Sequence, residues 1–183
     1  MSIELYLSFC LATLVLILMP GPIVTLVVAQ SLRHGTATGL ATVAGSTIGN
    51  MVLVAAGAFG LSTMLTLLSD VFDLVRWLGA AYLIWLGVRE LRNRGVGLSD
   101  ADAGERSPNS KVFWQGIVVA VTNPKTILFY VAFFPQFIDP AAPLGSQLAL
   151  MCVSFLVIGT VFDSAYALLA GRLRGVLQSG RGA

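Results

Sequence analysis

The sequence predicts an all-α integral membrane protein with about five transmembrane helices. Of its 183 residues, 56% are hydrophobic and 11% are charged, and its mean hydropathy is +0.85. Charged residues make up roughly a quarter of an ordinary soluble domain. No charged side chain interrupts the ranges Leu5–Leu32 and Gly35–Ser69, and a spanning helix needs only about 20 apolar residues. We therefore expect a single transmembrane domain over residues 1–183.

The apolar runs set the positions of the expected spans. These are Ile3–Ala29, Gly39–Leu65, Val71–Leu91, Phe113–Ile138 and Gly145–Gly171. Because no Lys or Arg precedes the first run and no small-residue cleavage site follows it, we expect an uncleaved span rather than a signal peptide. Residues 93–112 include a Gly-, Ser- and Asp-rich stretch without apolar periodicity, which is typical of a loop.

Basic residues gather in alternate connections between the spans. They are Arg33 after span one, Arg89, Arg92, Arg94, Arg106 and Lys111 between spans three and four, and Arg172, Arg174 and Arg181 after span five. The other connections hold Asp70 and Asp139 and neither Lys nor Arg. By the positive-inside rule, the N-terminus is outside, and the 93–112 loop and the C-terminus are cytoplasmic.

Four spans carry a helix breaker or a polar side chain near the membrane midplane. A helix rises about 1.5 Å per residue through a hydrocarbon core about 30 Å thick, which places Pro20, Asn50, Lys125 and Asp163 at similar depth. An unpaired charge there costs several kcal/mol. Asp163 is the acidic residue at a depth comparable to that of Lys125, so we expect both to face one polar interior.

Prolines are expected to break two of these spans. Pro20 and Pro22 have no N–H and push the residues before them, Met19 and Gly21, away from helical angles. Pro22 then suits the first turn of a new half-helix. In "AVTNPKTILF", Asn123 is a good N-cap and Pro124 fits the first helical position, so a second half-helix starts there.

The two broken spans run in opposite directions, which is typical of inverted repeats in a secondary transporter. Residues 1–92 would form the first repeat and residues 113–183 a second, incomplete one. In each repeat, the broken span is followed by a span with a polar residue, Asn50 or Asp163. Free N–H groups and positive dipole ends of the half-helices favour an anion such as a carboxylate.

Small residues follow one stripe of the second span. They are Ala41, Gly45, Gly49, Val52, Ala56 and Gly60. Such a stripe is most simply a helix-contact face, because small residues let helices approach closely. Asn50 lies beside the stripe, so Gly45 and Gly49 are also candidates for shaping a cavity.

A zwitterionic amino acid suits the groups at this depth. Its carboxylate would bind helix ends and Lys125, and its ammonium would bind Asp163 and freed carbonyls; alternatively, Asp163 carries a coupling proton. One His, His34, and two widely spaced cysteines give neither a zinc site nor a CxxC pair. The midplane offers neither a carboxylate pair nor a His base, so we expect no enzyme, metal or cofactor.

Several segments resemble the LysE/RhtB family of amino-acid exporters. They are "MPGPIVTLVVAQSLRHGTATGLATVAGSTIGN", "LGAAYLIWLGVREL" and "FWQGIVVAVTNPKTILFYVAFFPQFI". The PGP, the G-x-x-x-x-x-G-x-x-x-G run of Gly39, Gly45 and Gly49, the NPK and the PQF carry the resemblance in combination. It implies proton-driven export of amino acids or derivatives across the bacterial inner membrane by a homodimer in the lipid bilayer, with no nucleic-acid partner. The direction of transport comes from the resemblance alone.

Members of that family usually continue through a sixth apolar helix, whereas this sequence ends at Ala183 after "GRLRGVLQSGRGA". Two interpretations stay open, a five-span variant and a truncated chain. The alternatives to an amino-acid exporter are an ion or metal efflux protein and a truncated membrane protein that transports nothing.

Overall fold

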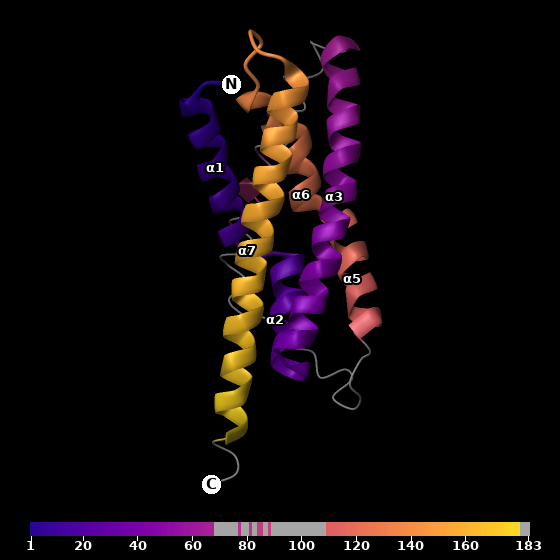
Figure 1. The fold of residues 1–183 in the computed structure, drawn as a ribbon, viewed down its shortest axis with the longest axis vertical. Helices are drawn as coiled ribbons and strands as arrows, with labels where there is room; N and C mark the ends of the chain where they lie inside the picture. The colour runs from indigo at the N-terminus through magenta and orange to yellow at the C-terminus, as the bar shows by residue number, and fades with distance from the viewer. Residues whose placement is uncertain (68–76, 78–80, 82–83, 86–87, 89–108, 180–183) are drawn as a thin grey trace.

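The part of the chain that the structure describes is almost entirely helical (Figure 1). This computed structural model describes residues 1–67, 77, 81, 84–85, 88 and 109–179. Its helices are α1 (Ile3–Leu18), α2 (Pro22–His34), α3 (Thr36–Leu67), α5 (Asn109–Val121), α6 (Pro124–Leu128) and α7 (Leu144–Ser179). A π-helical turn, η1 (Phe129–Phe133), and a 3₁₀ turn, η2 (Phe134–Phe137), follow α6. The predicted all-α class is confirmed.

Four of the expected spans have counterparts among the described residues. Three helical segments are long and apolar enough to cross a membrane: Thr36–Ala58, Asn109–Phe137 and Leu144–Gly175. Helices α1 and α2 pass the same test together, as a pair bent by 50°. The expected third span, Val71–Leu91, lies outside the described residues apart from five helical positions.

The described segments of the bundle run in two opposite directions (Figure 1). Helices α1 and α2 lead away from the end that holds the N-terminus, and α3 returns toward it. Helices α5 and α6 also run toward that end, and α7 leads back to the C-terminus. The broken pair α1–α2 therefore runs antiparallel to the broken pair α5–α6, in the orientation that the sequence predicts.

Glycine residues let α3 and α5 approach until backbone meets backbone. A Cβ atom added to Gly45 would collide with the carbonyl oxygen of Phe113. One added to Gly49 would lie 2.7 Å from the carbonyl oxygen of Ile117. From α5, Gly116 presents its bare Cα to the backbone of α3 in the same way. Small residues at such positions permit the close packing by which helices associate in lipid.

The predicted contact stripe on α3 extends only part of the way along the helix. Val52, Ala56 and Gly60 are exposed, and a Cβ added to Gly60 would meet no atom of a described residue within 4 Å. The expectation of one continuous stripe is therefore wrong beyond Gly49. Beyond Gly49, α3 packs through a different face, which includes the buried Val54 as well as Gly57, whose added Cβ would lie 3.7 Å from Cβ of Tyr130.

Adding a single methyl group at Gly45 is expected to destabilise the bundle. In Gly45→Ala, the new Cβ must push α5 away from α3, and overpacking of this kind costs roughly 1–3 kcal/mol. The measurement is thermal unfolding of the purified protein in detergent. Gly60→Ala is the matched control on the same helix and should unfold at the parental temperature or slightly above it, because Ala is the better helix former. Equal unfolding temperatures for the two variants would contradict this packing.

Aromatic side chains fill the half of the bundle nearest the N-terminus. Phe9 of α1, Phe129 of η1 and Phe155 of α7 are buried together. The rings of Phe9 and Phe134 meet edge to face with centroids 5.2 Å apart, and those of Tyr130 and Phe155 with centroids 4.9 Å apart. Such pairs contribute roughly 0.5–1.5 kcal/mol each beyond their buried area. This aromatic cluster closes the bundle on the side that the sequence predicts to be outside.

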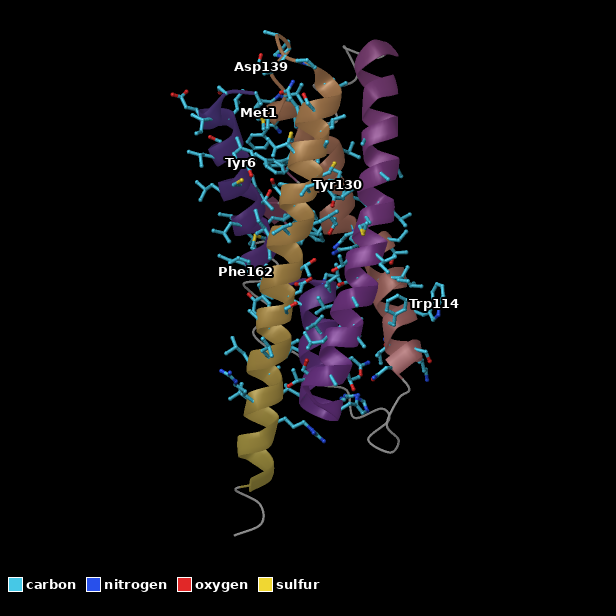
Figure 2. All side chains as sticks on the ribbon, in the orientation of Figure 1. Met1, Tyr6, Trp114, Tyr130, Asp139 and Phe162 are labelled. Atoms are coloured by element: carbon cyan, nitrogen blue, oxygen red, sulfur yellow. The ribbon has the colours of Figure 1, made fainter. Side chains whose placement is uncertain are left out.

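Polar contacts tie the same end of the bundle together. The N-terminal ammonium of Met1 lies 3.9 Å from Oδ2 of Asp139, and Figure 2 shows both residues at that end. Gln147 of α7 accepts a hydrogen bond from the Asp139 N–H at 2.9 Å and donates one to the Asp139 carbonyl at 3.0 Å. By contrast, Trp114 projects outward from α5 (Figure 2) and is 64% exposed, as expected of a side chain facing lipid.

Candidate functional site

The break between α1 and α2 lies at the predicted prolines. Helix α1 ends at Leu18, and Met19 and Gly21 both have extended backbones. Pro22 occupies the first turn of α2, whose first internal hydrogen bond runs from the Thr25 N–H to the Gly21 carbonyl at 2.9 Å. Without N–H groups on Pro20 and Pro22, the chain cannot continue one helix through this segment.

The second break also has the predicted local structure. Asn123 has an extended backbone, and its Oδ1 accepts a hydrogen bond from the Lys125 N–H at 3.1 Å. Pro124 occupies the first turn of α6. The second break bends the chain less than the first. Helices α5 and α6 and the two turns after them form one segment from Asn109 to Phe137, whereas α1 and α2 are bent by 50°.

The two breaks meet in the interior of the bundle. Nζ of Lys125 donates a hydrogen bond to the carbonyl oxygen of Met19, the last residue before the first break. A Cβ atom at Gly21 would lie 3.4 Å from both Cδ and Nζ of Lys125. The Met19 carbonyl lacks a helical donor, so the Lys125 ammonium supplies the partner that a buried carbonyl needs.

A cavity of about 40 Å³ lies where the breaks meet, with room for a few water molecules. Its polar lining comes from α3, from α6 with its N-cap and from α7, and comprises Asn50, Asn123, Lys125, Thr126 and Asp163. Its apolar lining and backbone come from Leu16, Ile17, Gly21, Ile23, Val24, Phe155 and Gly159. Leu16 and Phe155 belong to the aromatic cluster and its surroundings, which therefore bound the cavity on that side.

The cavity lining includes a buried lysine and a buried aspartate side chain. Lys125 is 6% exposed and Asp163 is 7% exposed, and the two charges interact electrostatically. Two such ions out of water are tolerated only when each has compensating partners. The sequence-based expectation that Lys125 and Asp163 face one polar interior agrees with their shared place in the cavity lining.

Asn50 adds a polar atom that the described chain leaves without a partner. The residue lies on α3, lines the cavity and is 8% exposed. Its Oδ1 accepts no hydrogen bond from any described residue. A buried acceptor without a donor carries a desolvation cost of about 1–3 kcal/mol. Oδ1 is therefore available to a donor that enters the cavity.

The other predicted site residues fall into two groups. Gly21 and Asn123 line the cavity, and Pro20, Pro22 and Pro124 shape the two breaks beside it. Gly45 and Gly49 are absent from the cavity lining and lie in the contact between α3 and α5. Their placement fits helix packing, the simpler of the two interpretations of the stripe.

Sequence reasoning missed seven residues that line the cavity. Four flank the first break, Leu16, Ile17, Ile23 and Val24, and the other three are Thr126, Phe155 and Gly159. Thr126 directly follows Lys125 and carried no signal of its own. Phe155 and Gly159 precede Asp163 at intervals of four residues, which places all three on one face of a helix. The four-residue spacing is visible in the sequence. It identifies a cavity-facing side of the helix only once Asp163 is known to point toward the interior.

The described residues contain no group of three or more His, Cys, Asp or Glu side chains arranged to hold a metal ion. Cys10 and Cys152 are both free thiols.

Comparisons with known proteins agree with this architecture. The family described as LysE type translocator matches residues 14–182. The chain is 32% identical over 173 residues to the homoserine/homoserine lactone efflux protein of Salmonella typhimurium, covering 94% of this chain and 84% of that protein. It is 34% identical over 170 residues to the leucine efflux protein of Enterobacter sp., covering 87% and 81%. A leucine efflux protein of Klebsiella pneumoniae is 35% identical over 170 residues, covering 91% and 78%.

No solved structure matches the chain. The family match begins in the last part of α1 and extends over both breaks, α3 and α7, so it includes every residue that lines the cavity. The chain therefore belongs to the LysE-type translocator family.

Proposed function

We propose that this chain is a secondary transporter that exports amino acids or their derivatives across the bacterial inner membrane. The observation that carries the proposal is the cavity between the two helix breaks, which holds the buried charges of Lys125 and Asp163. Intramembrane ionisable groups facing a cavity mark substrate or ion pathways. A ligand with one positive and one negative group matches this lining, and free amino acids have that charge pattern.

The names of relatives support the same substrate class. Those described above are named as efflux proteins for homoserine, homoserine lactone or leucine. Helices broken at the same level and running in opposite directions are also the architecture expected of inverted-repeat transporters. We propose that residues 1–92 and 113–183 form the two repeats, and that the proton gradient drives export. Homodimer formation stays a prediction.

An export assay with a panel of amino acids tests the proposal directly. Cells producing the parental chain are loaded with each amino acid, and its appearance in the medium is followed with and without an uncoupler that collapses the proton gradient. We expect faster export of at least one neutral amino acid than from cells with empty vector, and loss of that difference with the uncoupler. Export of none would contradict amino-acid transport and favour either an ion efflux protein or a chain that transports nothing.

The basic residues predict which end of the bundle faces the cytoplasm. Ser110, at the start of α5, and Ala141, in the connection before α7, are exposed at opposite ends of the bundle. In intact cells, a membrane-impermeant thiol reagent should label Ala141→Cys and leave Ser110→Cys unlabelled until the cells are opened. The native Cys10 and Cys152 are replaced by Ala in both variants. Labelling of Ser110→Cys from outside would reverse the proposed orientation.

A further inference from the structure

The first turn of α2 offers backbone N–H groups that have no acceptor. In an α-helix, the first N–H groups lack intrahelical partners and are usually satisfied by a capping side chain. Here the N-cap residue is Gly21, which has no side chain and makes no cap. Pro22 has no N–H, and no described residue accepts a hydrogen bond from the N–H of Ile23 or Val24. The start of this 13-residue helix is therefore open.

The second break does not repeat this feature. At α6, the Asn123 side chain accepts a hydrogen bond from the Lys125 N–H and so caps its own helix. Only α2 therefore presents an uncapped start among the two half-helices. The sequence suggests two equivalent positive helix ends. The two ends differ because the N-cap residue is Gly21 at α2 and Asn123 at α6.

The open start of α2 faces the cavity next to a cation. Gly21, Ile23 and Val24 all belong to the cavity lining. Nζ of Lys125 lies 3.4 Å from the position that a Gly21 Cβ would take. Free N–H groups, the positive end of the helix dipole and a nearby ammonium together favour a negatively charged ligand group.

The side chain of Asn50 gives a second, independent indication of the ligand's chemistry. Asn50 lines the same cavity, and its buried Oδ1 has no donor among the described residues. It therefore requires a hydrogen-bond donor from whatever binds. A ligand that satisfies both features has an anionic acceptor group and an N–H donor, as in a free α-amino acid.

We propose that the substrate carboxylate binds the N–H groups of Ile23 and Val24, that its ammonium donates to Asn50 Oδ1, and that Gly21 keeps this carboxylate site open by having no side-chain acceptor to cap these N–H groups. This inference rests on the proposed amino-acid export and assigns the orientation of the substrate within it. Asp163 is then not needed as the ammonium ligand and stays available for the coupling proton.

Substitutions at Gly21 test the carboxylate site because the position tolerates a side chain. Its φ of −144° is extended backbone that any residue adopts, and a Cβ would make ordinary contact with Lys125 at 3.4 Å. In Gly21→Asn and Gly21→Ser, the new side-chain oxygen would accept from the first-turn N–H groups, as capping residues do. Gly21→Ala adds the Cβ without a capping oxygen and is the matched control.

We expect the two capping variants to export about tenfold less than Gly21→Ala at equal amounts in the membrane, a loss of the size expected when a charge-assisted hydrogen bond is displaced. The same variants should unfold at a temperature equal to or above that of Gly21→Ala in detergent, because a cap stabilises the helix. Lower export with undiminished stability separates a blocked carboxylate site from a misfolded protein.

A competition arm checks the chemistry of the ligand. Export of a labelled amino acid by the parental chain is measured in cells that also contain the same amino acid as its free acid or as its carboxamide. The carboxamide should compete about tenfold less well, because it lacks the negative charge that the helix start favours. Asn50→Leu should weaken transport of the free acid, whereas the exposed Asn109→Leu should not.

The outcomes separate this inference from the function on which it rests. If the parental chain exports an amino acid and Gly21→Asn or Gly21→Ser exports as fast as Gly21→Ala, the carboxylate site is wrong and the exporter stands. Equal competition by the carboxamide would overturn it in the same way. If the parental chain exports no amino acid, the proposed function fails, and the substrate orientation fails with it.

Discussion

Replacing Asp163 by Asn is expected to abolish export driven by the proton gradient. Asp163 is buried in the cavity that also holds Lys125, and the substitution keeps its size while removing the group that can take up and release a proton. If Asp163 carries the coupling proton, Asp163→Asn should still exchange labelled for unlabelled amino acid across a membrane without a gradient. If it binds the substrate ammonium instead, exchange should fall at least about tenfold as well.

Both activities are measured with the purified protein in lipid vesicles, where the gradient and the substrate on each side are set independently. Asp139→Asn is the matched control, because Asp139 lies in the connection before α7 and does not line the cavity. It should retain gradient-driven export. If Asp163→Asn transports at the parental rate with the gradient while stably inserted, Asp163 has no part in the mechanism.

Removing the other buried charge is expected to damage stability more than any other single change in the cavity. In Lys125→Met, the Met19 carbonyl loses its donor and Asp163 loses the nearby cation. Leaving one buried charge without its compensating neighbour is strongly destabilising, by up to about 3–5 kcal/mol where the two groups are in direct contact. We expect a large fall in the thermal unfolding temperature in detergent, together with loss of export.

The double variant Lys125→Met/Asp163→Asn distinguishes charge compensation from simple loss of packing. With neither charge present, the penalty for a lone buried carboxylate disappears, so the double variant should unfold at a higher temperature than Lys125→Met alone. Export should stay absent. Lys111→Met serves as the control, since Lys111 is exposed in the first turn of α5. No recovery in the double variant would show that the two charges are not coupled.

The sequence located both helix breaks because their cause is local. A proline lacks an N–H and clashes with the preceding turn wherever it stands in a helix, so Pro20, Pro22 and Pro124 could be interpreted without knowing their surroundings. Asn123 was predicted as an N-cap by the same local chemistry, and its Oδ1 accepts from the Lys125 N–H. The spans at α3 and α7 follow from apolar length, which also needs no tertiary information.

The glycine stripe on α3 marks where such reasoning fails. Gly45 and Gly60 carry the same local signal, yet the first touches the α5 backbone and the second meets no atom of a described residue within 4 Å. Whether a small residue is a contact depends on which face of α3 the neighbouring segment packs against, and that is not encoded in the spacing of the stripe itself.

By itself, the sequence determined the all-α membrane class, the depth of the polar residues and the places where two helices break, since each depends on a residue and its immediate neighbours. Only the tertiary structure decided that Lys125 donates to the Met19 carbonyl, 106 residues away. It also decided that the uncapped start of α2 lines one cavity with Asn50, whose Oδ1 has no donor among the described residues. These facts depend on how separate helices pack, because a carbonyl or an N–H freed by a break finds its partner through space and not along the chain.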